Sequence, residues 1–212
     1  EPNDETSMLN DSRAAMELFP TQPGVYLFNG IANNQKKNYK EAAKNLKIGS
    51  QLIIGNPFLS AQMLASLGDA YHELGKHTSS DSAYNASLKY DSNNLYVLNN
   101  YSYFLSLRNV ELGRALKMSR KTIAKEPLNA SYLDTYGWIL YLKGEFNEAE
   151  KYLSKSLMNG GEKSAEVLEH YGDVLYRLNR KDEANAYWKK AKEAGGSSEA
   201  LINKTSSKKL DD

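Results

Sequence analysis

Residues 133–157, LDTYGWILYLKGEFNEAEKYLSKSL, contain two amphipathic segments separated by Gly144. The large apolar residues recur at intervals of three, four or seven positions, which is the spacing of one face of a helix. One small residue lies in each segment, Gly137 in the first and Ala149 in the second. Two antiparallel helices can pack closely only where small side chains let their backbones approach. The stretch therefore predicts a helical hairpin with Gly137 and Ala149 at the crossing, surrounded by Leu133, Tyr136, Leu140, Phe146, Leu153 and Leu157.

The same arrangement recurs along the chain at intervals of 34 to 38 residues. The first small position is held by Gly30, Gly68, Ser102, Gly137 and Gly172. The second is held by Ala42, Ser80, Ala115, Ala149 and Ala184, and a third by Ser87, Thr122, Ser156 and Ala191. A single hairpin cannot bury both of its faces, so successive hairpins must complete each other's core. The recurrence predicts an array of five stacked hairpins.

The pattern Leu133–x2–Tyr136–Gly137–x2–Leu140–x3–Gly144–x–Phe146–x2–Ala149–x3–Leu153–x2–Ser156 resembles the tetratricopeptide repeat, a helix-turn-helix unit of 34 residues. The resemblance covers roughly residues 5–196. It is weaker in the first unit, where Asn29 and Asn33 take positions that are normally apolar, and in the third, where Ser102 replaces glycine. It implies an all-α fold, a right-handed superhelical solenoid of antiparallel helix pairs.

The turn residues divide residues 1–212 into parts of one solenoid. We expect repeats at 23–56, 57–93, 94–128, 129–163 and 164–196. Residues 7–19 match the second helix of a repeat whose first helix is missing. A start at Glu1 rather than Met fits the same interpretation, the C-terminal part of a longer bacterial repeat protein.

The last segment, 197–209, is expected to hold a capping helix and a tail. Ser197, Ser198 and Glu199 form a helix-start signal, and solenoids need a polar cap. The basic residues Lys204, Lys208 and Lys209 are accompanied by acidic ones at Asp211 and Asp212. We therefore expect this end of the chain to be solvated.

Composition excludes several classes of function. The chain has 27 basic and 26 acidic residues and a net charge of +1, so it has no general attraction for nucleic acid or anionic lipid. It has no cysteine, which excludes disulfides, thiolate metal sites and cysteine nucleophiles. No apolar run is long enough for membrane insertion. We expect no cofactor.

The candidates for chemistry are weak. His72 and His77 lie five residues apart, whereas the zinc-protease motif needs its histidines four apart on one helix face. Residues 160–164, GGEKS, lack the spacing and the preceding strand of a phosphate-binding loop. No Ser, His and Asp set can be placed together. The sequence therefore gives no support to an enzyme.

In the tetratricopeptide family, the first helices of successive repeats line a concave groove. The repeat register places these candidate partner-binding residues there: Asp69, His72, Asn99, Asn100, Tyr103, Asp134, Trp138, Tyr141, Glu169, His170, Asp173, Tyr176 and Arg177. The aromatic rings could anchor a ligand, the asparagines could bond its backbone, and the carboxylates would favour Lys or Arg. The alternative is that the rings only pack against neighbouring repeats. The cations typical of a carboxylate clamp are missing from the corresponding positions.

Two kinds of function remain open. The first is a scaffold that binds a peptide or a partner protein in the groove without catalysis. The second is a structural module that tethers a domain upstream of residue 1 or forms an oligomer. The chain also resembles repeat proteins of the bacterial cell envelope, through Leu168 to Asp173 and a last helix that carries Trp188. This implies a periplasmic or membrane-associated location, with the cytoplasm as the alternative.

Overall fold

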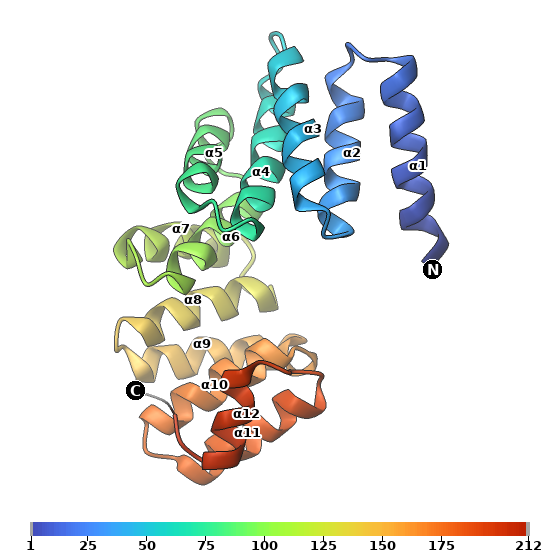
Figure 1. The fold of residues 1–212 in the computed structure, drawn as a ribbon. Helices are drawn as coiled ribbons and strands as arrows, with labels where there is room; N and C mark the ends of the chain where they lie inside the picture. The colour runs from blue at the N-terminus through green and yellow to red at the C-terminus, as the bar shows by residue number, and fades with distance from the viewer. Residues whose placement is uncertain (1, 211–212) are drawn as a thin grey trace. The chain divides into compact units, whose positions relative to one another are not determined.

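The computed structural model describes residues 2–210, and within that range all regular structure is helical (Figure 1). The first five helices are α1 (Pro2–Leu18), α2 (Pro23–Gln35), α3 (Tyr39–Leu52), α4 (Pro57–Glu73) and α5 (His77–Tyr90). The remaining elements are α6 (Leu95–Leu107), α7 (Leu112–Lys125), α8 (Ala130–Leu142), α9 (Phe146–Met158), a 3-10 turn η1 (Gly161–Lys163), α10 (Ala165–Arg177), α11 (Lys181–Glu193) and α12 (Glu199–Ser207). The expected all-α class is confirmed. Asp211 and Asp212 lie outside the described residues.

The chain divides into two compact units. Unit 1 is Glu1–Val97 and contains α1 to α5. Unit 2 is Leu98–Asp212 and contains most of α6 and the elements from α7 to α12. In unit 1, α2 packs against α3 and α4 against α5, and in unit 2, α8 packs against α9 and α10 against α11. None of the described helices combines the length and apolarity needed to span a bilayer.

The paired helices of unit 1 approach each other most closely at small residues. A Cβ atom at Gly30 would lie 2.3 Å from Cγ of Leu46, which is a severe overlap. At Gly68 it would lie 2.8 Å from Cε1 of Tyr84. Only glycine therefore lets α2 approach α3, and α4 approach α5, at these distances.

The asparagines that weaken the repeat pattern in unit 1 form a buried polar network. The side-chain oxygen of Asn29 accepts hydrogen bonds from Nδ2 of Asn33 at 2.8 Å and from Nδ2 of Asn45 at 2.6 Å. Nδ2 of Asn29 donates to Oγ of Ser12 at 3.0 Å. Because buried amides must find hydrogen-bond partners, this network fixes α1, α2 and α3 relative to one another.

The hairpins of unit 2 follow the same rule. A Cβ atom at Gly137 would lie 2.8 Å from Cγ of Leu153 and 3.3 Å from the carbonyl oxygen of Ala149. The predicted crossing of Gly137 and Ala149 is therefore confirmed. Where Ser102 replaces glycine, its hydroxyl is buried and donates to the carbonyl oxygen of Leu98 at 2.6 Å.

The C-terminal helix α12 starts at Glu199 and places a buried cation, Lys204, in unit 2. Oγ of Ser198 caps α12 by accepting from the amide of Leu201 at 3.1 Å, and the Leu201 side chain is fully buried. The expectation of a solvated end is wrong for Lys204, which is only 8% exposed. Its ammonium lies 2.7 Å from Oε1 of Glu169 and 2.8 Å from Oδ2 of Asp173. The reason is that these two carboxylates of α10 face α12 and hold the cation.

Candidate ligand-binding face of unit 2

One side of unit 2 is formed by the first helices of its hairpins, α6, α8 and α10, together with the capping helix α12. We call this side the inner face and define it by Asn99, Tyr103, Leu107, Asp134, Trp138, Glu166, Glu169, His170, Asp173 and Lys204. It contains a cavity of about 400 Å³, whose lining includes Tyr103, Leu107, Trp138, Glu166, Glu169, His170, Asp173 and Lys204. A smaller cavity of about 200 Å³ is lined by residues that include Asn99, Tyr103, Asp134, Thr135 and Glu166. Both cavities share Tyr103 and Glu166.

Trp138 is held in a defined orientation on this face. Its ring is nearly parallel to that of Tyr141, with 4.8 Å between centroids, and to that of His170, with 4.0 Å between centroids. Its indole Nε1 is buried and has no hydrogen-bond partner among the described residues. Trp138 is half-buried, so part of the ring remains available to the larger cavity. The arrangement gives a rigid aromatic wall.

His170 is fixed by a carboxylate of the neighbouring hairpin. Its Nδ1 lies 3.0 Å from Oδ1 of Asp134, and both side chains are buried. Burial alone would lower the pKa of His170, but the charge and hydrogen bond of Asp134 outweigh it and raise the pKa above its ordinary value. The pair therefore connects α8 to α10 most strongly when His170 carries its proton.

The His170–Asp134 pair should make the free energy of unfolding fall as the pH rises. A raised pKa in the folded state means that the contribution is complete below the unfolded value of about 6.5 and is lost as the pH rises through the folded value. Urea unfolding of the wild type and of His170→Gln, followed by circular dichroism at several pH values above and below this range, measures the effect. The variant is expected to lack this part of the pH dependence, and equal slopes in both proteins would contradict the assignment.

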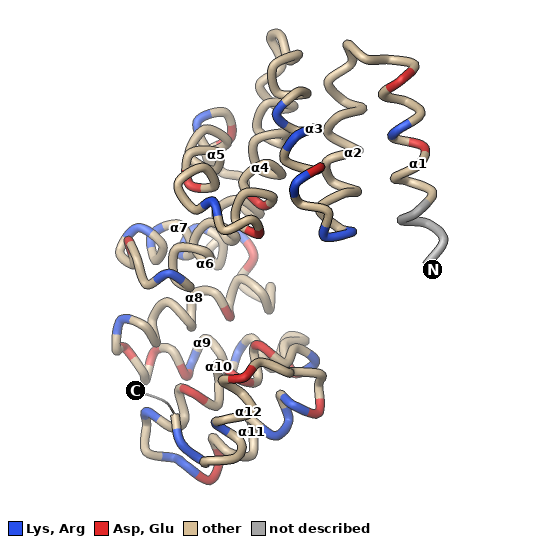
Figure 2. The backbone as a smooth tube through the Cα atoms, viewed as in Figure 1, with Lys and Arg blue, Asp and Glu red and all other residues tan. Residues whose placement is uncertain are grey.

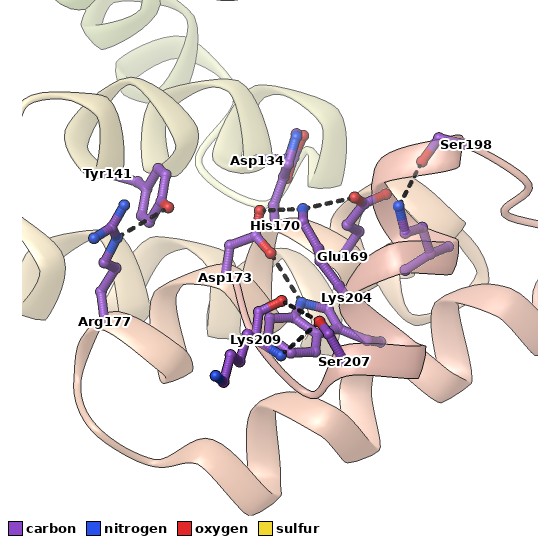
Figure 3. A network of polar contacts seen from close by, with 12 residues as sticks. Asp134, Tyr141, Glu169, His170, Asp173, Arg177, Ser198, Lys204, Ser207 and Lys209 are labelled. Atoms are coloured by element: carbon purple, nitrogen blue, oxygen red, sulfur yellow. Dashed lines mark hydrogen bonds and ion pairs between the residues drawn. The ribbon is translucent and has the colours of Figure 1, made fainter. Parts of the chain in front are cut away.

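A second polar network joins α10, α11 and α12 (Figure 3). Asp173 accepts from Lys204 and also from Nε1 of Trp188 at 2.8 Å. Burial raises the pKa of the Asp173 carboxyl, and Lys204 acts in the opposite direction. Burial alone would lower the pKa of Lys204, but Asp173 and Glu169 hold it above its ordinary value. Lys204 therefore stays charged and compensates part of the negative charge on this face.

Tyr103 and Glu166 form a bridge between α6 and α10. The Tyr103 hydroxyl donates to Oε1 of Glu166. Burial, followed by the charge of Glu166, raises the pKa of Tyr103, so the phenol keeps its proton and remains a donor. Glu166 itself is exposed to solvent. Because both residues line both cavities, this bridge lies at the boundary between them.

Charge is unequally distributed over the helices of unit 2 (Figure 2). The helix α7 carries five basic residues and no acidic one, namely Arg114, Lys117, Arg120, Lys121 and Lys125. The helices α6, α8 and α10 carry one basic residue, Arg177, and four acidic residues, namely Asp134, Glu166, Glu169 and Asp173. The first helices therefore carry more acidic than basic residues, and three of the four carboxylates are paired with His170 or Lys204.

The structure places the other predicted contact residues in different settings. Nε of Arg177 lies 3.5 Å from the hydroxyl of Tyr141, and Tyr176 packs near Trp188, with ring centroids 5.6 Å apart. Asn100 is half-buried on α6 and lines neither cavity. Arg177, Tyr141, Tyr176 and Asn100 therefore line neither cavity of the inner face.

Asp69 and His72 belong to unit 1. Asp69 accepts hydrogen bonds from the hydroxyls of Tyr84 and Tyr96, the latter at 2.7 Å, and it lines a cavity of about 400 Å³ within that unit. The rings of His72 and His77 lie 5.8 Å apart. Among the described residues, no three or more His, Cys, Asp or Glu side chains are grouped to hold a metal ion.

Sequence reasoning missed Glu166, Leu107 and Lys204 as residues of the inner face. A signal for Lys204 was present. Asn99, Asp134, Glu169 and Lys204 follow one another at steps of 35 residues, so the register continues into the capping helix. Glu166 and Leu107 lie near the ends of their helices, where the register alone does not show which way a side chain faces.

Comparison with known proteins agrees with this architecture. Residues 61–94 match the family model described as tetratricopeptide repeat. No curated protein matched the chain by sequence.

Solved structures share the fold at low sequence identity. The protein pilF of Pseudomonas aeruginosa has a TM-score of 0.70 and 22% identity over 85% of this chain and 79% of its own. MamA of Desulfovibrio magneticus RS-1 has a TM-score of 0.67 and 17% identity over 82% and 94%. A chain of the APC/C hetero-tetramer Cut9–Hcn1 has a TM-score of 0.84 and 13% identity over 98% and 40%. Residues 61–94 therefore match a tetratricopeptide repeat in sequence, and the chain as a whole has the fold of these solenoids.

Proposed function

We propose that the inner face of unit 2 binds an extended segment of a partner protein that carries lysine or arginine, without catalysis. Tetratricopeptide repeats serve as protein–protein interaction scaffolds, and the chain has this fold. The fold supports a role as a binding scaffold. The carboxylates that line the cavities support a partner segment that carries lysine or arginine.

The larger cavity carries the proposal. Its apolar lining includes Tyr103, Leu107 and Trp138. The carboxylate of Glu166 lies in the same lining, and so does that of Glu169, which is paired with Lys204. Lysine and arginine combine a long apolar stem with a charged end, so the stem can pack along aromatic rings while the cation reaches a carboxylate. An acidic segment would meet repulsion from the same groups.

Glu166 is the best residue to test, because it is exposed and its loss leaves no buried charge unpaired. We expect fluorescently labelled hexalysine to bind the chain and labelled hexaglutamate not to bind, as measured by fluorescence anisotropy at low salt. Glu166→Gln should weaken hexalysine binding by about threefold to tenfold, because it removes one charge from the cavity. The effect should diminish as salt screens the charges.

The matched control is Glu193→Gln. Glu193 lies exposed in the last turn of α11, lines neither cavity of the inner face, and undergoes the same change of charge. It is expected to bind hexalysine like the wild type. Equal weakening by both variants would indicate a general charge effect and would contradict binding of hexalysine at the inner face.

A further inference from the structure

Asn99, Asp134, Glu169 and Lys204 occupy equivalent positions at steps of 35 residues, and among the described residues the Oδ1 atom of Asn99 has no hydrogen-bond partner. Of the equivalent positions, Asp134 bonds His170, and Glu169 bonds Lys204. Asn99 is only 8% exposed, and its Oδ1 is buried without a hydrogen-bond partner among the described residues. A buried, unsatisfied amide oxygen is costly, so its retention here requires an explanation.

The surroundings of Asn99 show what kind of group could satisfy it. Asn99 lines the cavity of about 200 Å³, where α8 contributes Asp134 and α10 contributes Glu166. The lining therefore brings together one amide side chain and two carboxylate side chains from three different helices. No Lys or Arg is among the residues that line it. These groups match a cation that donates several hydrogen bonds.

We propose that this cavity is a subsite for a primary ammonium, the side-chain end of a lysine in the bound segment. The proposal rests on the function proposed above and specifies it further. An ammonium is compact and has three rotatable donors, which suits acceptors on several sides. A guanidinium is planar and has its donors in a fixed fork, so it fits a small cavity less well. Asn99 is then the residue that selects lysine over arginine.

Burial makes the selection strong. A cation that leaves water must be paired with charge and hydrogen-bonded. Glu166 supplies that charge, and Asp134, which is already bonded to His170, adds a second carboxylate. Acetylation of the lysine removes the charge and two of the donors, so acetyl-lysine should not occupy the subsite.

The test compares labelled hexalysine, hexaarginine and hexa-acetyl-lysine on the wild type, Asn99→Leu and Asn100→Leu. The wild type should prefer hexalysine over both other peptides. Asn99→Leu keeps the size of the side chain but removes the acceptor, and it should weaken hexalysine binding about tenfold or more while leaving hexaarginine within about twofold. Asn100→Leu, the neighbouring residue outside the cavity, should bind all three peptides like the wild type.

Asn99→Asp provides a second variant if leucine impairs folding. It retains the acceptor and adds a negative charge, so it should bind hexalysine at least as tightly as the wild type. If hexalysine binds but Asn99→Leu and Asn100→Leu bind it equally, the ammonium subsite is overturned while the proposed function stands. If hexalysine binds no better than hexaglutamate to the wild type, the proposed function itself fails.

Discussion

Replacing Trp188 with alanine is expected to lower the free energy of unfolding by about 3–5 kcal/mol. The side chain is 0% exposed and packs directly under Gly172 at the α10–α11 crossing. Its Nε1 also donates to Asp173, so alanine would remove both the ring and a hydrogen bond to a buried carboxylate. The loss combines a large cavity with an acceptor that is deprived of one partner.

Urea unfolding followed by circular dichroism measures this loss, with Trp188→Phe as the matched variant. Phenylalanine keeps most of the apolar volume and removes the donor, so it should cost clearly less than alanine. A loss below about 1 kcal/mol for Trp188→Ala would contradict the position of this side chain in the core, since buried aromatic truncations cost more.

Gly172→Ala is expected to lower the free energy of unfolding by about 1–3 kcal/mol, although alanine normally favours a helix. The added Cβ would lie 2.5 Å from Cδ1 of Trp188 and 3.2 Å from the carbonyl oxygen of Ala184. Neither group can move freely, because the ring is buried and the carbonyl belongs to the backbone of α11. The two helices must therefore separate.

Gly113→Ala is the matched control, because the same change is made in a helix where nothing lies within 4 Å of the new Cβ. It should raise the free energy of unfolding by about 0.5–1 kcal/mol, through the lower entropy of the unfolded chain and the better helix propensity. Opposite signs for the two substitutions are expected in parallel urea titrations. If both stabilise the protein, close approach at Gly172 is not what sets the hairpin geometry.

The hairpins could be predicted because their information is local and repeated. Gly137 and Ala149 meet as expected, since the helical period fixes which residues share a face and small side chains mark the crossing. In unit 1, the sequence shows that Asn29 and Asn33 occupy normally apolar positions of the repeat. It does not show which residues bond them. A pattern of apolar positions does not show that Ser12 and Asn45 complete a buried network.

The sequence could predict which positions lie on the first helices. It could not predict which side chains at those positions contact one another. The register placed Trp138 and His170 on adjacent first helices, and the structure brings their rings together. Whether such residues face solvent or each other depends on neighbouring side chains, which the register does not contain. Asp134, His170 and Asp173 are buried and positioned by their partners, whereas Glu166 remains exposed.

The most direct test of the inner face is a nuclear magnetic resonance titration of the ¹⁵N-labelled chain with hexalysine. The chain has two tryptophans, so the indole signal of Trp138 can be assigned by its loss in Trp138→Phe. We predict saturable shifts of the Trp138 indole and of the amides around Tyr103 and Glu169. Shifts confined to the second helices α7, α9 and α11, with the Trp138 indole unchanged, would contradict a binding site on the inner face.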